Sequence, residues 1–223
     1  MPIISGVILV AGAAAMLSAQ APVPVGKEPH HKTLLDTFVF RILEVTVPPG
    51  DTTLDHSHDR DIATIALEEA TTRTRGPGEE WSAPRERSRG STSVTEYTGK
   101  PGSHRVETIG KTPYRLIAVE NHRQGSWTTP KPLQAPGTTL AQQTRAFTIY
   151  DVKLGASTPN TAHVHDVTAV AVLVSGTIEN GGSNGEEPAK FERPGQWIFI
   201  PTGPHEMNIL GSGEAHVIEV EVR

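Results

Sequence analysis

Short runs of alternating apolar and polar residues follow one another along the chain after residue 37. The runs are rich in valine, isoleucine and threonine, and glycine, proline, aspartate or asparagine bounds each of them. A period of two residues is typical of β-strands with one buried face, and no helical period of 3.6 residues accompanies it. The pattern predicts strands over residues 40–47, 61–68, 104–109, 114–120, 145–154, 168–179, 196–201 and 216–223.

Three stretches interrupt this pattern. Residues 31–37 are expected to form a short turn, and the long polar stretch 71–92 is expected to be a loop. Residues 122–144 carry three prolines and no apolar period, which is typical of a connector between two β units. Many short strands separated by turn residues predict an all-β barrel or sandwich.

The two halves of the chain repeat each other. RILEVTVPPG, which begins at Arg41, leads to a glycine and then to His-x-His, and so does RAFTIYDVKLG, which begins at Arg145. Further along, a histidine, a glycine six residues later and an Ile/Val strand recur in residues 104–121 and 205–223. Because the offset between the halves stays near 101–107 residues at three separate landmarks, an internal duplication is indicated. It pairs two histidine sets, namely His56, His58 and His104, and His163, His165 and His205.

Each histidine set has the arrangement of an open metal site. Residues i and i+2 of a strand point to one face, about 6.5–7 Å apart, so both imidazoles of a His-x-His pair can aim at one point. A third histidine from a distant strand completes three nitrogen ligands and leaves coordination positions over. A lone His-x-His pair is more often a surface or packing feature, but its duplication favours metal ligation. The histidines without a repeated counterpart are expected to be surface or structural residues: His30, His31, His122 and His216.

Composition narrows the chemistry and the partners. The 223 residues include no cysteine, which excludes disulfides and thiolate ligands and leaves nitrogen and oxygen donors for a metal. Charged residues make up 20% of the chain and the net charge is −5, with lysine and arginine scattered. No nucleic-acid partner is therefore expected, and a small molecule is the expected partner.

The first residues have the shape of a secretory signal. In residues 1–21 an apolar stretch is followed by small residues and a Pro-rich exit, which predicts cleavage after Ala19. This places the protein in the periplasm or outside the cell, with no membrane association beyond the export signal. An N-terminal strand or an uncleaved anchor is the alternative, although the run is short for a spanning helix.

The histidine and glycine motifs resemble those of the cupin superfamily, whose first motif joins Gly and His-x-His and whose second joins Pro-x-Gly and His. The first half matches at Gly50, His56, His58 and His104, and the second at His163, His165, Gly176, Gly195, Pro201, Gly203 and His205. The chain resembles a bicupin of the quercetin-dioxygenase-like type. The resemblance implies two tandem antiparallel cupin barrels (a double-stranded β-helix, or jelly-roll) at 38–121 and 145–223, with 122–144 as the linker.

The chain departs from the cupin pattern at the glutamate ligand. The positions where the family has this glutamate hold Ile62 and Ala169. Without a carboxylate, a divalent metal keeps its full charge, which favours anionic ligands such as hydroxide, a carboxylate or an enolate. Asp61 lies one residue from the expected position and could replace the glutamate only if the strand bulges. Asp59 and Asp166 are expected either to orient an imidazole or to face solvent.

The resemblance implies a metal-dependent dioxygenase that acts on a small substrate bearing an enol or a carboxylate. Fe(II) is the preferred metal, with Cu, Mn, Ni or Zn as alternatives, and the six paired histidines are the expected ligands. A redox-silent isomerase or lyase and a non-catalytic cupin that binds a metal or small ligand are further alternatives. Glu107 is either a general base or a turn residue, and Trp197 and Phe199 are expected in the core. A homodimer through an edge strand, 114–120 or 216–223, is also open.

Overall fold

The computed structural model describes residues 21–126, 131–181 and 188–223. These residues form β-strands and one short 3-10 helix, η1 (Val25–Lys27), so the all-β prediction is confirmed. No helix within these three segments is long and apolar enough to cross a membrane. The signal sequence expected at the start of the chain, with its cleavage site after Ala19, lies outside the described residues.

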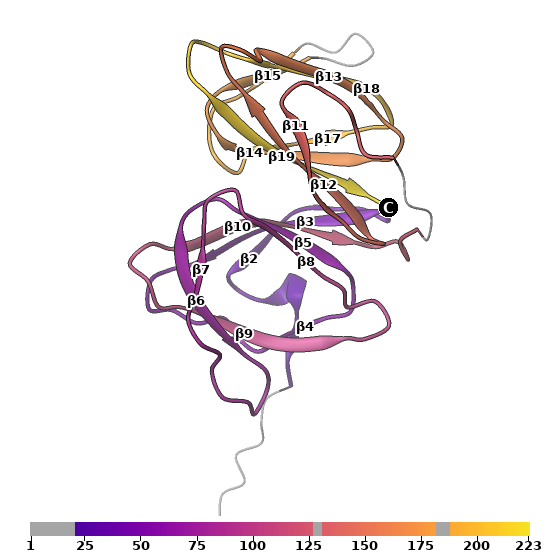
Figure 1. The fold of residues 1–223 in the computed structure, drawn as a ribbon. Coiled ribbons are helices and arrows are strands. Elements are labelled where there is room, and N and C mark those ends of the chain that lie inside the picture. Colours follow the sequence, from indigo (N-terminus) through magenta and orange to yellow (C-terminus); the bar gives the residue numbers. More distant parts are fainter. Residues whose placement is uncertain (1–20, 127–130, 182–187) are drawn as a thin grey trace, which may run out of the picture.

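The first half of the chain folds into two five-stranded sheets that close into a barrel (Figure 1). One sheet has the order β1-β4-β9-β6-β7 and carries the first histidine set; the other has the order β2-β3-β10-β5-β8. The strands of this barrel are β1 (Val23–Pro24), β2 (His31–Asp36), β3 (Phe40–Val47), β4 (His56–His58), β5 (Ile62–Ala66), β6 (Ala70–Arg75), β7 (Arg85–Arg87), β8 (Thr92–Thr95), β9 (Gly102–Thr108) and β10 (Tyr114–Asn121).

The second half repeats this arrangement. Its sheets have the orders β11-β12-β19-β14-β17 and β13-β18-β15-β16, and the second carries the other histidine set. The corresponding strand orders agree with the internal duplication that the sequence indicates. The strands are β11 (Thr138–Gln143), β12 (Phe147–Leu154), β13 (Asn160–His165), β14 (Ala169–Ser175), β15 (Ile178–Asn180), β16 (Ala189–Phe191), β17 (Trp197–Ile200), β18 (Gly203–Ile209) and β19 (Ala215–Val222).

Two edge strands lie where the sequence predicts a turn and a connector. β2 occupies most of the expected turn at 31–37, and β11 begins at Thr138, inside the expected linker 122–144. Each strand pairs antiparallel with the next strand along the chain and contains a β-bulge. A bulge interrupts the two-residue alternation of side chains, so the apolar pattern does not reveal these strands. The two sheets therefore begin before residues 38 and 145.

Two further segments differ from the prediction. The polar stretch 71–92 contains most of β6 and all of β7, an antiparallel pair at the edge of a sheet. A strand that faces a polar cavity shows no apolar alternation, which explains the error. The predicted strand 168–179 is divided into β14 and β15 at Gly176. The backbone there has φ of 83°, and a Cβ would lie 2.3 Å from the carbonyl oxygen of Glu214.

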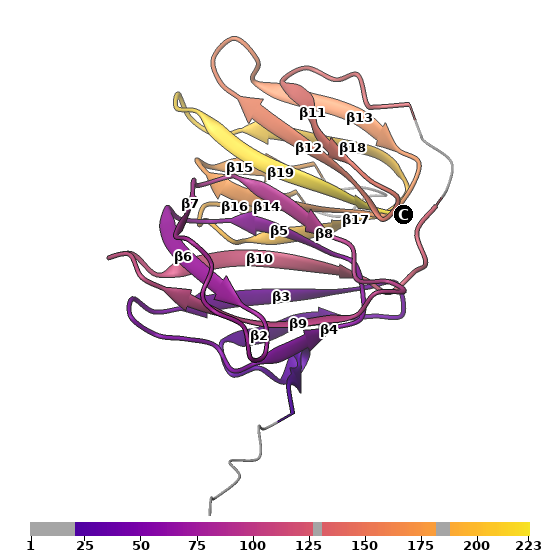
Figure 2. The same ribbon diagram turned by 60° about the horizontal axis from the view of Figure 1, so that its bottom comes forward.

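A hydrophobic core lies between the two barrels. The sheet that contains β3, β10 and β5 packs against the sheet that contains β12, β19 and β14 (Figure 2). Arg145 of the second half also pairs with Asp61 of the first, with 2.8 Å between Nη2 and Oδ2. The two repeats therefore share one interior. Buried side chains of this shared core include Phe40, Ile42, Ile117, Phe147, Ile149 and Ile218.

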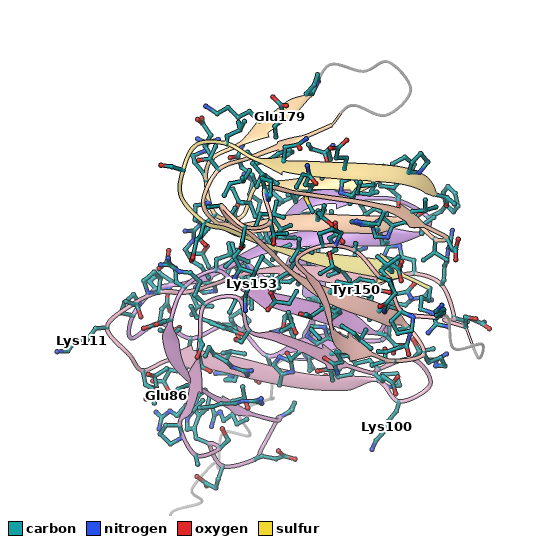
Figure 3. The ribbon with its side chains drawn as sticks, turned by 45° about the horizontal axis from the view of Figure 1, so that its top comes forward. Glu86, Lys100, Lys111, Tyr150, Lys153 and Glu179 are labelled. Atoms are coloured by element: carbon teal, nitrogen blue, oxygen red, sulfur yellow. The ribbon has the colours of Figure 1, made fainter. Side chains whose placement is uncertain are left out.

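The interiors of the two barrels are filled differently. Tyr150, which is labelled in Figure 3, is buried in an apolar cluster that occupies the second barrel, together with Leu173 and Met207. Charged side chains such as Lys100 and Lys111 project outward (Figure 3). In the first barrel the apolar cluster borders a cavity of about 690 Å³. The first barrel therefore has room for a small molecule beside its histidines.

Candidate metal centres

The structure brings the first histidine set together. His56 and His58 stand two residues apart on β4 and share a face, and His104 on β9 lies directly opposite His56 in the strand register. One ring nitrogen of each lies within 4.8 Å of the others. The ring centroids are 4.6 Å apart for His56 and His104, and 5.0 Å apart for His58 and His104. This convergence is what the duplicated motif predicts.

Each histidine of this set keeps at least one ring nitrogen available to bind a cation. His56 Nδ1 lies 3.0 Å from the carbonyl oxygen of Leu54 and must donate to it, so Nε2 carries the lone pair. Both ring nitrogens of His58 are buried and have no hydrogen-bond partner. Burial and the neighbouring imidazoles lower the pKa of His58 to about 2 and that of His104 to about 4. The imidazoles are therefore neutral, the form that binds metals.

Tyr97 and His31 complete the wall around the first set. The Tyr97 ring stacks on His58 at 4.7 Å between centroids, and its hydroxyl lies 3.4 Å from His104 Nδ1. His31 lies with its ring 4.8 Å from that of His56, and its Nδ1 is 2.5 Å from Oε2 of buried Glu28. Both side chains line the cavity. The expectation that His31 is merely surface or structural is therefore too narrow.

Asp61 does not replace the missing glutamate ligand. Its Oδ1 accepts hydrogen bonds from the backbone N–H groups of Tyr97 and Thr98 at 2.8 and 2.7 Å. Its Oδ2 pairs with Arg145, and the residue is fully buried. The strand keeps its alternation, so the carboxylate turns away from the histidines and instead holds the segment that carries Tyr97.

The second histidine set also converges. His163 and His165 lie on β13, and His205 on β18 is the direct register partner of His163. The Nε2 atoms of His163 and His165 are 3.0 Å apart. His165 is held from its other side, because its Nδ1 lies 3.0 Å from Oε1 of Glu221. The three predicted rings therefore lie together, with centroids 4.7, 5.2 and 5.7 Å apart. The ligand atoms that come within 4.8 Å of one another belong to His163, His205 and Glu219, so His165 is not part of this ligand set.

Glu219 supplies this second site with a carboxylate that the sequence analysis missed. Its oxygens lie 3.2 Å from Nε2 of His163 and 3.3 Å from Nε2 of His205. Neither contact has hydrogen-bond geometry, and both oxygens are buried. Burial would raise the pKa of the Glu219 carboxyl, but the two histidines lower it below its ordinary value. The carboxylate is therefore ionised.

The carboxylate comes from a different strand than the cupin motif implies. Glu219 lies on β19 and pairs across the sheet with Ala171, whereas the motif points to Ala169 on β14. The equivalent position in the first barrel is Ala118, which pairs with Thr64. Alignment of the two repeats along β10 and β19 would have revealed this difference. The expected lack of a carboxylate is thus correct for the first site and wrong for the second.

Both sites fit a first-row divalent metal. Ring nitrogens converge in each site, and both sites contain buried polar atoms without hydrogen-bond partners. Such orphaned polar atoms are costly unless a bound group satisfies them. The ligand sets that could hold an ion are His56, His58 and His104 in the first barrel, and His163, His205 and Glu219 in the second.

The remaining candidate residues lie away from the ligands. Glu107 pairs with Arg73 at 2.5 Å, so it is neither free nor in a turn but on β9. Asp59 and Asp166 are exposed, and neither bonds an imidazole among the described residues, in line with the solvent-facing alternative. Trp197 packs against the shared core, as expected.

Two other expected features take a different form. Phe199, expected in the core, is 45% exposed, although it stacks on Phe40 at 5.9 Å. The histidines outside the two sets pair with carboxylates, as His31 does with Glu28; the other three are His30 with Asp51, His122 with Glu120 and His216 with Asp151. These three are structural residues, as the sequence predicts.

Comparison with known proteins gives a clear answer on the fold alone. No family model and no curated protein matches the sequence. AerE from Microcystis aeruginosa is 13% identical with a TM-score of 0.63, and the match covers 91% of this chain and 98% of that chain. Salicylate 1,2-dioxygenase from Pseudoaminobacter salicylatoxidans is 15% identical with a TM-score of 0.63, over 90% and 75% of the two chains.

A third solved structure carries the name of the fold. The cupin 2 conserved barrel domain protein from Leptotrichia buccalis is 9% identical with a TM-score of 0.54, over 92% of this chain and 100% of that chain. The protein described here therefore has the cupin fold, with two barrels in tandem and a histidine cluster in each. Identities this low extend to the fold and to no particular activity.

Proposed function

We propose that the protein is a metal-dependent enzyme of the dioxygenase type, acting in its first barrel on a small substrate that bears an enol or a carboxylate. One observation carries the proposal: three neutral imidazoles converge without a carboxylate at the wall of a cavity of about 690 Å³. Such a set leaves coordination positions for a substrate and for dioxygen and keeps the metal's charge for anionic ligands.

His56, His58 and His104 would hold Fe(II), with Cu, Mn, Ni or Zn as alternatives. When bound, Fe(II) supplies the redox chemistry that dioxygen activation requires. Tyr97 stacks on His58 and fixes the plane of that ring, and its hydroxyl beside His104 can hold or donate a proton at the cavity wall. Hydroxyl groups of Thr64 and Ser93, which bond each other at 2.7 Å, offer polar contacts for a substrate.

The dioxygenase reaction suits a site built from this chain alone. Both atoms of dioxygen enter the product as a substrate bond is cleaved, so no second reductant is needed. Salicylate 1,2-dioxygenase, which shares the fold at 15% identity, shows that this fold can carry a dioxygenase site. A redox-silent isomerase or lyase would use the same three histidines by polarising a carbonyl group.

A second function, metal or ligand binding without turnover, is favoured by the second barrel. Its site contains the ionised Glu219, which offsets part of the charge of a divalent ion. Its interior is occupied by an apolar cluster that includes Tyr150 and Met207. We assign this site to ion binding that stabilises the barrel, and we place the reaction in the first barrel.

Oxygen uptake separates these functions. Protein reconstituted anaerobically with Fe(II) is supplied with oxygen and with salicylate, gentisate or a flavonol, and oxygen consumption is recorded. We expect uptake in the unmodified protein and a loss of at least about 100-fold in His104→Ala. The variant His205→Ala should keep activity within about threefold. Uptake that survives His104→Ala, or binding of a substrate without any uptake, would contradict the enzyme proposal.

Export is a separate proposal that rests on the sequence pattern before residue 21. We expect periplasmic or secreted protein to begin after Ala19 when its N-terminus is sequenced. Full-length protein found only in the cytoplasmic fraction would contradict it. A small molecule is the proposed partner, and sedimentation of purified protein would reveal whether a homodimer forms.

A further inference from the structure

Arg87 is the last residue of β7 and faces the interior of the first barrel. β7 pairs with β6 so that Arg87 lies opposite Ala70, and Thr74, further along β6, lies opposite Val106 on β9. Side chains that are register partners, or that are separated by an even number of residues along a strand, share one face of a sheet. His104 is two residues from Val106, so Arg87 and His104 lie on the same inward face.

The guanidinium of Arg87 has no protein partner. Its Nε is buried without a hydrogen bond, and within the described residues no ion pair or hydrogen bond reaches the side chain. Arg105 and Arg115, by contrast, pair with Asp55 and Glu68 at 2.6 and 2.8 Å. Arg87 is half-buried, and a buried guanidinium nitrogen without a partner is costly, so its presence indicates a role with an anion.

The cavity supplies no counter-charge of its own at this position. The carboxylates that line it in the described residues are Glu79 and Glu80, and both are exposed. Thr74 and Ser82 line the cavity together with Arg87 and share a neighbouring pocket with it. Arg75 also lines the cavity, and its guanidinium lies over the Trp81 ring. The local surface thus combines arginines with neutral hydroxyl groups, which suits a carboxylate.

We propose that Arg87 binds the carboxylate of the substrate while the rest of that molecule reaches the three histidines. This inference rests on the proposed function and names the substrate class: a small organic acid with its metal-binding oxygen apart from its carboxylate. An arginine fork can hold a carboxylate with two parallel hydrogen bonds. By the same register Arg87 lies two strand spacings and about six residues from His104, roughly 20 Å between backbones, and both residues line the cavity. The two side chains reach toward each other across part of this distance, so the bound molecule needs its metal-binding oxygen at the end opposite its carboxylate.

The second barrel lacks this feature. The last residue of its corresponding short strand, β16, is Phe191, which is buried in the apolar cluster of that barrel. A pocket of about 570 Å³ also borders His163 and His205, but no arginine or lysine is among the described residues that line it. The unpaired cation therefore accompanies the cavity of the first barrel, beside the histidine set that has no carboxylate. This coincidence links anion binding to the proposed reaction site.

Calorimetric titration of Zn(II)-loaded protein tests the inference without requiring turnover. The probes are 4-hydroxybenzoate, benzoate and the neutral 4-hydroxybenzamide, because the para hydroxyl lies at the end of the ring opposite the carboxylate. We expect the unmodified protein to bind 4-hydroxybenzoate at least tenfold more tightly than the amide, and Arg87→Gln to abolish that preference. Arg87→Lys should keep part of it, because it keeps the charge and loses the fork. Arg89→Gln removes an exposed charge two residues away and should keep all of it.

Stability gives a second readout. Because Arg87 has no partner to lose, Arg87→Gln should unfold at the same temperature as the unmodified protein or a higher one. A lower unfolding temperature would indicate a structural role and overturn the inference. A preference that persists in Arg87→Gln, or no carboxylate binding at millimolar concentration, would overturn it too. If the unmodified protein shows the carboxylate preference but takes up no oxygen, the dioxygenase function is contradicted and the role of Arg87 is retained.

Discussion

At the scale of single residues, the two metal sites differ at one pair of equivalent positions, Glu219 and Ala118. They occupy equivalent positions on β19 and β10, opposite Ala171 and Thr64. The small Ala171 leaves room for the carboxylate in the second barrel, whereas Ala118 lines the cavity in the first. The difference between Glu219 and Ala118 at this one position thus explains why the second ligand set contains a carboxylate and the first contains only imidazole nitrogens.

Removal of the Glu219 charge should weaken the second site alone. In Glu219→Gln we expect Zn(II) affinity at the second site to fall at least about tenfold, because an ionised ligand becomes a neutral one. Competition with a chromophoric chelator measures both affinities. The exposed Glu214 provides the control variant Glu214→Gln, which should behave as the unmodified protein. Equal affinities in the two variants would show that Glu219 does not bind the ion.

The buried histidines predict an acid-sensitive metal-free protein. In the folded protein the pKa of His58 is about 2 and that of His104 about 4, whereas in the unfolded chain both have a pKa of about 6.5. As the pH falls from 6.5 toward 4, the unfolded chain binds protons that the folded chain does not. The free energy of unfolding should therefore fall with pH, by up to about 3 kcal/mol per unit for the two residues.

Urea unfolding of chelator-treated protein at pH 7.5, 6.5 and 5.5 measures this slope. His58→Leu should show a shallower slope, because one of the groups with a lowered pKa is removed while His31, His56 and His104 remain. A free energy of unfolding that stays constant over this range would contradict the assignment of neutral buried imidazoles.

At the scale of secondary-structure elements, one ion pair links the second repeat to the wall of the first site. Arg145 precedes β12 and pairs with Asp61, which precedes β5 and bonds the backbone of Tyr97. Tyr97 in turn stacks on His58. The position of the cavity wall therefore depends on a residue from the other half of the chain.

Breaking this pair should be costly. In Arg145→Met the fully buried Asp61 keeps its charge without a cation, and we expect a loss of about 3–5 kcal/mol in the free energy of unfolding. Adding Asp61→Asn should recover part of the loss, because the stranded charge is removed. A double-mutant cycle in urea measures the coupling. Strictly additive losses would show that the two side chains act independently.

The strands that sequence reveals are those with one clean apolar face. β3, β10, β12 and β19 were predicted within a residue or two, because their inner residues fill the shared core. β6 and β7 were missed since their inward faces meet a polar cavity, and β2 and β11 because bulges break their alternation. The apolar pattern therefore does not reveal strands whose inner face is polar, as beside the cavity, or whose alternation is interrupted by a bulge.

The histidines were predictable and their partners were not. Spacing of two residues on a strand, repeated in both halves, places each set on one face, and the structure brings both sets together. Glu219 was hidden because β19 alternates Val and Glu in a way that also suits an exposed edge. Arg87 was hidden because it lies in a segment read as a loop. Both depend on register between strands distant in sequence.

At the scale of the whole molecule, the two repeats share one hydrophobic core. The cluster between the barrels draws buried residues from both halves, and Asn121 donates hydrogen bonds to the carbonyl oxygens of Ala146 and Arg223 at 3.0 and 2.8 Å. Separation of the halves would expose this surface to water. We therefore expect the two repeats to unfold as one cooperative unit.

One core substitution should then destabilise both barrels together. Phe147 is fully buried in the shared cluster, and Phe147→Ala should cost about 3–5 kcal/mol. Hydrogen exchange followed separately in β10 and β19 should show the same loss of protection in both strands. Loss confined to the second barrel would show that the halves unfold independently.

The central claim is that His56, His58 and His104 together coordinate a metal ion in the first barrel. A crystal structure of Fe(II)-loaded protein with anomalous scattering measured at the iron edge tests it most directly. We predict a peak about 2.1 Å from one ring nitrogen of each of the three histidines, the usual imidazole–metal distance for such ions. An iron-saturated crystal with no anomalous peak among these three rings would contradict the account.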